Sequence, residues 1–115
     1  MGIQEIELSR GTPVILYLQA PKEKVWGILV SLNPSGVVVR GLDLVVFDEW
    51  MRQEARGEEA GLGLATIFYP MGRLERMERD ESLGPLASYA DRFFRAVGRT
   101  VHAAAGLSPE RGDGG

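Results

Sequence analysis

Residues 25–42 read VWGILVSLNPSGVVVRGL, and this stretch decides the fold that the sequence predicts. Its centre, residues 33–36, has asparagine first, proline second and glycine fourth, which is the pattern of a type I turn. The residues on both sides are rich in valine, isoleucine and leucine, as strands are. Two strands, 25–32 and 37–42, are therefore expected to fold back on each other around this turn.

A glycine interrupts each of these two strands, Gly27 the first and Gly41 the second. Glycine inside a strand often marks a bulge or a sharp bend, because it has no side chain to pack. Two short bent strands around a tight turn favour a small closed barrel over a flat sheet. Bulky side chains such as Trp26 and Val39 are then expected inside the barrel.

Three further strands are predicted on either side of this stretch. Residues 14–18 precede it, and residues 64–69 follow it and end at a proline. Residues 71–81 are ambiguous, because Met71, Leu74 and Met77 have helical spacing. A turn at 70–73 followed by a strand at 74–79 is favoured, because a small barrel needs a fifth strand to close it.

Helical periodicity appears in two places. Phe47, Trp50, Met51 and Ala55 form the apolar stripe of a helix over residues 47–56, with glycine next. Residues 88–91 have a capping-box pattern that predicts a second helix. Gly98 either ends this helix or interrupts it before residues 101–105.

Length and composition predict one domain. The chain has 115 residues, of which 44% are hydrophobic and 25% are charged, as in an ordinary globular protein. Residues 1–105 are expected to form a single α+β domain, and residues 106–115, GLSPERGDGG, a disordered tail. The N-terminus carries acids where a signal peptide would be basic, and apolar stretches are short, so a cytoplasmic protein with no membrane contact is expected.

The order of these elements resembles an Sm-like (SH3-type) small barrel over residues 14–79. The predicted fold class is therefore α+β, a small bent five-stranded barrel or sheet with a helix between strands 3 and 4 and a C-terminal helix. In such barrels the fourth and fifth strands pair with neighbouring subunits, so the resemblance implies a homo-oligomer. It also implies RNA binding, but the turn at 33–36 lacks the family's aspartate, and residues 70–73 lack its histidine.

A second resemblance comes from three stretches, KVWGILVSL (24–32), GVVVRGLDL (36–44) and FDEW (47–50). They are similar to an uncharacterised family of short bacterial proteins, which implies no function. Asn33 is the only asparagine, and there is no cysteine. Such a composition is seen in heat-adapted proteins, but a GC-rich genome gives much of the same bias.

Catalytic and metal-binding chemistry is not predicted. His102 is the only histidine and lies near a helix end, where the helix dipole favours it. With one histidine and no cysteine, the common zinc sites cannot form within one chain. The adjacent acids Asp80 and Glu81 are expected to be solvated. We therefore expect no catalytic residue, no metal and no cofactor, although enzyme activity stays open.

Two groups of residues are candidate binding sites. Arg40, Asp43 and Arg73 are candidates for a small-molecule pocket, although Asp43 could instead pair with Arg40 or cap the following helix. Partner-binding candidates are Phe68, in the apolar strand 65–69, and the arginines Arg92, Arg95 and Arg99, which the predicted helix places on one face. These arginines are expected to meet an acidic partner or the acidic segment 43–60 of another copy, unless they form only a polar helix face.

Three functions follow from these expectations. The first is a non-catalytic interaction or assembly module that forms homo-oligomers or binds a protein partner. The alternatives are an Sm-like RNA-binding protein and a small-molecule-binding protein. The net charge of −3 argues against nucleic acid as a partner.

Overall fold

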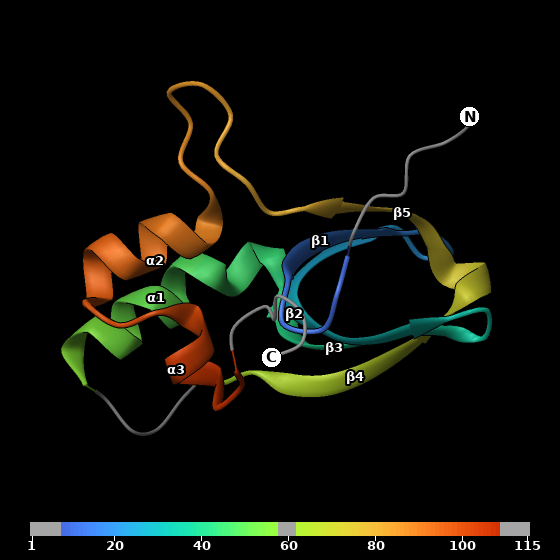
Figure 1. The fold of residues 1–115 in the computed structure, drawn as a ribbon, viewed down its shortest axis with the longest axis horizontal. Helices are drawn as coiled ribbons and strands as arrows, with labels where there is room; N and C mark the ends of the chain where they lie inside the picture. The colour runs from blue at the N-terminus through green and yellow to red at the C-terminus, as the bar shows by residue number, and fades with distance from the viewer. Residues whose placement is uncertain (1–7, 58–61, 109–115) are drawn as a thin grey trace.

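A five-stranded antiparallel sheet forms the centre of the computed structural model, which describes residues 8–57 and 62–108. The strand order is β4-β3-β2-β1-β5, for β1 (Pro13–Leu18), β2 (Glu23–Asn33), β3 (Gly36–Asp43), β4 (Ala65–Pro70) and β5 (Leu74–Arg79). Helices α1 (Phe47–Arg56), α2 (Tyr89–Val97) and α3 (Val101–Ala105) gather at one end of the sheet (Figure 1). The chain is thus α+β, and the predicted strand at residues 74–79 is confirmed.

The sheet bends where the two predicted glycines face each other. Gly27 of β2 pairs with Gly41 of β3. A Cβ on Gly41 would lie 2.1 Å from the carbonyl oxygen of Trp26, so no other residue fits there without a backbone shift. The close approach lets the sheet curl, with β1 and β5 on one side and β3 and β4 on the other (Figure 1).

Two hydrophobic clusters lie on opposite faces of this curled sheet. The inner cluster, enclosed by the strands, contains the buried residues Val14, Leu16, Leu18, Val25, Leu29, Val37 and Val39. The outer cluster lies between the sheet and the helices and contains Trp26, Ile28, Leu42, Phe47, Trp50, Phe93, Val101 and Ala105. Successive residues of a strand point to opposite faces, so β2 supplies side chains to both clusters.

The expectation that Trp26 lies inside the curl is wrong. Trp26 and Val39 are both fully buried, but Val39 belongs to the inner cluster and Trp26 to the outer one. The Trp26 ring packs edge-on against Phe47 of α1, with ring centroids 5.2 Å apart, and Trp50 stacks on Phe93 of α2 at 4.6 Å. Aromatic contacts with the amphipathic helices therefore account for the outward direction of Trp26.

The sheet is not closed, in contrast to the predicted barrel. β4 and β5 are its two edge strands, and a 3-10 turn over Met71–Arg73 joins them. The Met71 N–H donates to the Ser35 carbonyl at 2.9 Å, while the Gln19 N–H donates to the Arg73 carbonyl at 2.9 Å. The two ends of the turn are thus held at different places, and β4 and β5 leave it toward different neighbours.

Two short helices, instead of one, follow residues 80–88, which connect β5 to α2. Gly98 has a φ of 86° and ends α2, so α3 is a separate helix. Leu107 packs against the outer cluster, so the packed region reaches beyond the predicted boundary at residue 105. Residues 109–115 of the predicted tail lie outside the described residues.

Candidate functional site

Arg40 and Asp43, two of the predicted ligand-binding residues, are engaged by the chain itself. The Arg40 Nε–H donates to the Ala105 carbonyl at 2.9 Å, and its Nη1 donates to Thr66 Oγ1 at 3.2 Å. Arg40 thereby connects β3 with α3 and β4. The Asp43 carboxylate accepts the Val45 N–H at 3.0 Å, so it caps the 3-10 turn Leu44–Val46, as one of the sequence alternatives expects.

Arg73, the third predicted ligand-binding residue, holds the turn between β1 and β2. Its Nε–H donates to the Gln19 carbonyl at 2.8 Å, and its Nη2 donates to the Pro21 carbonyl at 3.1 Å. The Glu23 carboxylate lies 3.8 Å from the same guanidinium. Each of the three predicted residues therefore binds a different segment of its own chain, and the geometry explains them as structural contacts.

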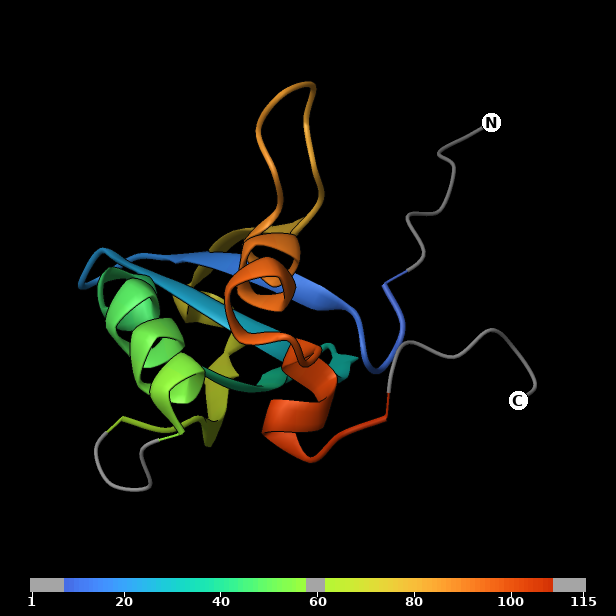
Figure 2. The ribbon, with the colours of Figure 1, turned by 90° about the vertical axis from the view of Figure 1, so that its left-hand side faces the viewer.

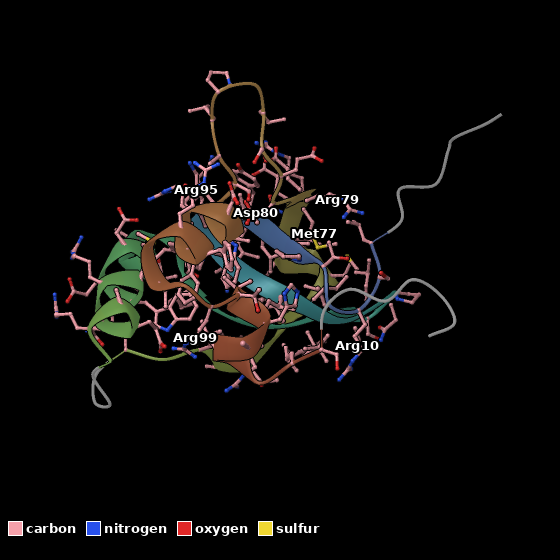
Figure 3. All side chains as sticks on the ribbon, turned by 60° about the vertical axis from the view of Figure 1, so that its left-hand side comes forward. Arg10, Met77, Arg79, Asp80, Arg95 and Arg99 are labelled. Atoms are coloured by element: carbon pink, nitrogen blue, oxygen red, sulfur yellow. The ribbon has the colours of Figure 1, made fainter. Side chains whose placement is uncertain are left out.

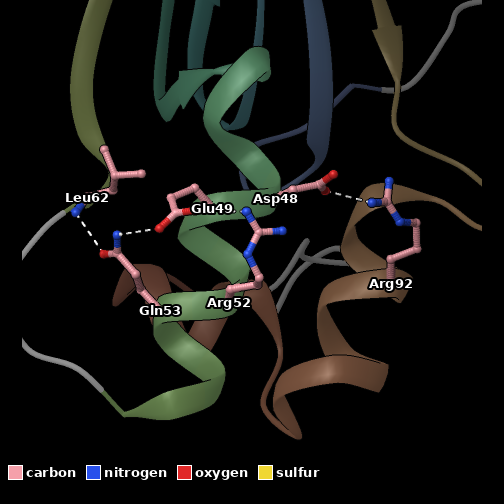
Figure 4. Close-up of polar contacts among 6 residues, drawn as sticks. All are labelled: Asp48, Glu49, Arg52, Gln53, Leu62 and Arg92. Carbon is pink, nitrogen blue, oxygen red and sulfur yellow. Dashed lines mark hydrogen bonds and ion pairs between the residues drawn. The ribbon is translucent and has the colours of Figure 1, made fainter.

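The arginines near the C-terminus meet the acidic segment that the sequence indicates, but within one chain. Arg92 pairs with Asp48 of α1 at 2.7 Å (Figure 4), and Arg99 pairs with Glu54 of α1 at 2.5 Å. Arg99 lies beyond the end of α2 instead of on its face. These contacts connect α1 with α2 and with the residues after it.

Local pairs complete the polar surface of the helices. Arg95 pairs with Asp91 one turn earlier on α2 at 2.7 Å. On α1, Glu49 binds Arg52 at 2.8 Å and Gln53 at 3.4 Å (Figure 4), and the hydrogen bond from Arg52 lowers the pKa of Glu49. Exposed pairs of this kind add little to stability, because water and salt screen the attraction between their charges.

β4 is an exposed apolar edge of the sheet. Among the described residues its only strand neighbour is β3, and its sequence ATIFYP contains no charge. Ile67 and Tyr69 pair with the buried residues Val39 and Val37, so they share the inner face. Phe68 points to the other face, where 53% of its surface is exposed.

β5, the opposite edge, combines apolar inner residues with charged outer ones. Leu74 and Met77 pack partly buried against the inner cluster. On the outer face, the Arg76 guanidinium lies 3.9 Å from the centre of the Tyr17 ring, and the Tyr17 hydroxyl donates to Glu78 at 3.1 Å. Partial burial raises the pKa of the Tyr17 hydroxyl, and the neighbouring Glu78 adds to this rise.

The sequence expectations include no protruding loop over residues 80–88, which we name the leucine loop. Asp80 stands at its base and is 9% exposed, in contrast to the solvated carboxylate that the sequence predicts. Its carboxylate accepts the Trp26 indole N–H at 3.0 Å and the backbone N–H groups of Tyr89 and Ala90 at 2.9 Å each. Figure 3 shows Asp80 below the loop.

The leucine loop protrudes from the body of the protein (Figures 1 and 2). At its tip, the backbones of Leu83 and Leu86 exchange hydrogen bonds of 2.9 and 3.0 Å around a two-residue turn in which Gly84 has a φ of 56°. The side chain of Leu83 is 63% exposed and that of Leu86 is 69% exposed. The Gly84-Pro85 dipeptide is the signal from which the turn, though not the exposure, could have been found.

A hollow of about 330 Å³ lies beside the leucine loop. Its walls include Leu83 and Leu86 of the loop, Ile15 of β1, and Tyr89 and Arg92 of α2. The mixed apolar and charged lining can accept a protein side chain. The hollow and the two leucines therefore form one continuous surface.

The single histidine contacts the backbone of its own chain. His102 Nε2 lies 2.7 Å from the Gly11 carbonyl, which connects α3 to the segment before β1. Residues 8–57 and 62–108 contain no group of three or more acidic, histidine or cysteine side chains that could hold a metal ion. None of the described helices has the length and apolar character needed to span a membrane.

No protein-family model, curated protein or solved structure matches this chain.

Proposed function

We propose that this protein is a non-catalytic assembly module in which β4 of one copy pairs with β5 of the next. The observation that carries the proposal is the β4 edge, a six-residue strand without charge that has β3 as its only strand neighbour within residues 8–57 and 62–108. Edge strands of this kind present unpaired backbone groups, and proteins usually protect them with lysine, a bulge or a covering element. Pairing with another copy provides the missing protection.

β5 is a suitable partner strand because both edges leave the inner cluster partly covered. Tyr69 on β4, and Leu74 and Met77 on β5, are half-buried where they meet that cluster, and the half-buried Ile67 of β4 pairs in register with its member Val39. If the two strands pair, these four side chains come to lie on one face, and the inner clusters of two copies become continuous. A β4–β4 pair would leave the apolar residues of β5 without this cover.

The resemblance to Sm-like barrels supports the same choice of partner strand. In that family the fourth and fifth strands pair between neighbouring subunits. The strand order here leaves the fourth and fifth strands at opposite edges, which a head-to-tail contact requires. Such a contact gives a closed ring or a longer chain of copies.

Light scattering of the purified full chain tests this proposal. At about 100 μM we expect a molar mass of several copies, because even a weak contact forms at that concentration. Replacing Thr66→Lys and Phe68→Lys together places two charges on the β4 edge and should abolish the head-to-tail contact. The control replaces Val45→Lys and Leu62→Lys, which are exposed apolar residues outside the strands.

The control should keep the mass of the unmodified protein. If the unmodified protein is a strict monomer at about 100 μM, the assembly proposal is wrong. If the β4 variant keeps the same mass as the control, copies associate through another surface and β4 is not the contact.

A further inference from the structure

We propose that the leucine loop is a clasp between two copies of this chain. In a two-fold pair, the Leu83 and Leu86 side chains of each copy enter the hollow beside the leucine loop of the other. This contact goes beyond the pairing of β4 with β5, because it uses the loop, the outer face of β1 and the start of α2.

The loop has the properties of a preformed docking element. Asp80 fixes one end to the Trp26 indole and to the start of α2, and the Ser88 N–H donates to Ser82 Oγ at 3.0 Å across the loop. The paired backbones of Leu83 and Leu86 fix the tip. Since the backbones of the exposed leucines are already held in place, little backbone entropy is lost when they bind.

The position of the hollow indicates that the occupant is a second copy. The protruding leucines and the hollow of about 330 Å³ lie side by side, and the same loop contributes to both. A two-fold axis places the protrusion of each copy opposite the hollow of the other, so every contact occurs twice. A chain carrying both halves of a contact on one surface is its own complement.

The charges around the hollow also favour a second copy as the occupant. The lining of the hollow includes three acids, Glu78, Asp80 and Glu81, and two arginines, Arg79 and Arg92. When two identical surfaces of mixed charge face each other, arginines of one copy can lie against carboxylates of the other. A nucleic acid or an anionic membrane would instead meet these three carboxylates, so a protein surface of mixed charge is the better fit.

Sedimentation velocity tests the clasp in a background where β4 is blocked. The variant with Thr66→Lys and Phe68→Lys should form a dimer at about 100 μM, because its leucine loop is intact. Adding Leu83→Ser and Leu86→Ser should raise the dimer dissociation constant at least about tenfold. A matched control adds Val45→Ser and Leu62→Ser to the same background and should leave the dimer unchanged.

The outcomes separate the clasp from the edge contact. A β4-blocked variant that is monomeric at about 100 μM overturns the clasp, whatever the unmodified protein does. A dimer that survives the loss of both leucines overturns it too. If the unmodified protein never exceeds a dimer, and that dimer depends on the leucines, the edge proposal fails and the clasp stands. Circular dichroism confirms that each variant is folded.

Discussion

The β4 edge and the leucine loop both expose apolar side chains, but they are supported in different ways. β4 is held along its length by backbone bonds to β3, and its exposure comes from the missing second neighbour. The leucine loop is held at its base by the buried Asp80 carboxylate and at its tip by a closed turn. In both places the exposed residue is distinct from the residues that hold it there. Loss of a support should therefore destabilise the protein, while loss of an exposed side chain should not.

The largest effect is expected for the support of the leucine loop. Asp80→Ala removes three hydrogen bonds to a carboxylate and leaves the buried Trp26 indole N–H without a partner. We expect a loss of about 3 kcal/mol in the free energy of unfolding. Urea denaturation measures it, with Glu81→Ala on the exposed neighbouring residue as the control. A loss below about 1 kcal/mol would show that the carboxylate does not anchor the loop.

A smaller loss in the free energy of unfolding is expected for a change at the bend that positions β3 and β4. The added methyl group of Gly41→Ala would meet the Trp26 carbonyl oxygen at 2.1 Å, so the paired strands must shift. We expect this variant to lose about 2 kcal/mol of stability in the same denaturation experiment. Gly72→Ala is the control, because nothing lies within 4 Å of its Cβ position and its φ is not positive. Equal stability of the two variants would contradict the close approach at Gly41.

A dependence of stability on pH is expected from one tyrosine at each edge of the sheet. The pKa of Tyr17, next to β5, and that of Tyr69, in β4, are both raised above the ordinary value of 10.0, mainly by burial. Because the folded state holds these protons more tightly, stability is fully present below pH 10.0 and is lost as the pH rises toward the folded pKa values. Absorbance at alkaline pH follows the titration.

Two variants assign that titration to the two tyrosines. Tyr17→Phe and Tyr69→Phe should each remove one late-titrating group from the absorbance curve. Glu78 also raises the pKa of Tyr17, so Glu78→Gln should move its titration down. If neither variant loses absorbance change above pH 10.0 relative to the unmodified protein, the pKa values of the two tyrosines are not raised and the prediction is wrong.

The smallest effect on stability is expected from the exposed residues. Leu83→Ser and Phe68→Ser replace side chains that are 63% and 53% exposed. Each should change the free energy of unfolding of the monomer by no more than about 0.5 kcal/mol, measured at low protein concentration. A loss of more than about 1 kcal/mol would mean that the side chain is packed within one copy.

Local patterns in the sequence predict much of this fold. The turn at residues 33–36, the bend at Gly27 and Gly41, and the helix over residues 47–56 depend on neighbouring residues and agree with the structure. Closure of the sheet into a barrel does not depend on such local patterns. It depends on distant pairings: β4 pairs with β3 and β5 with β1, and the turn between them bonds to Ser35 and Gln19, which are distant in sequence.

The candidate sites are less predictable because they depend on distant pairs of residues. The burial of Asp80 follows from its bond to Trp26, 54 residues earlier in the chain. The opposite charges of Arg99 and Glu54 predict an attraction, but only the packing of the helices places both in one chain. Sequence likewise predicts an apolar strand at β4 without deciding whether another strand covers its outer edge.

Hydrogen exchange of the β4 backbone tests the central proposal most directly. At low protein concentration, the β4 amides that do not donate to β3 should exchange as fast as unprotected groups. At about 100 μM they should be protected in the unmodified protein but not in the variant with Thr66→Lys and Phe68→Lys. Exchange of β4 that is the same at both concentrations would contradict the claim that this edge pairs with another copy.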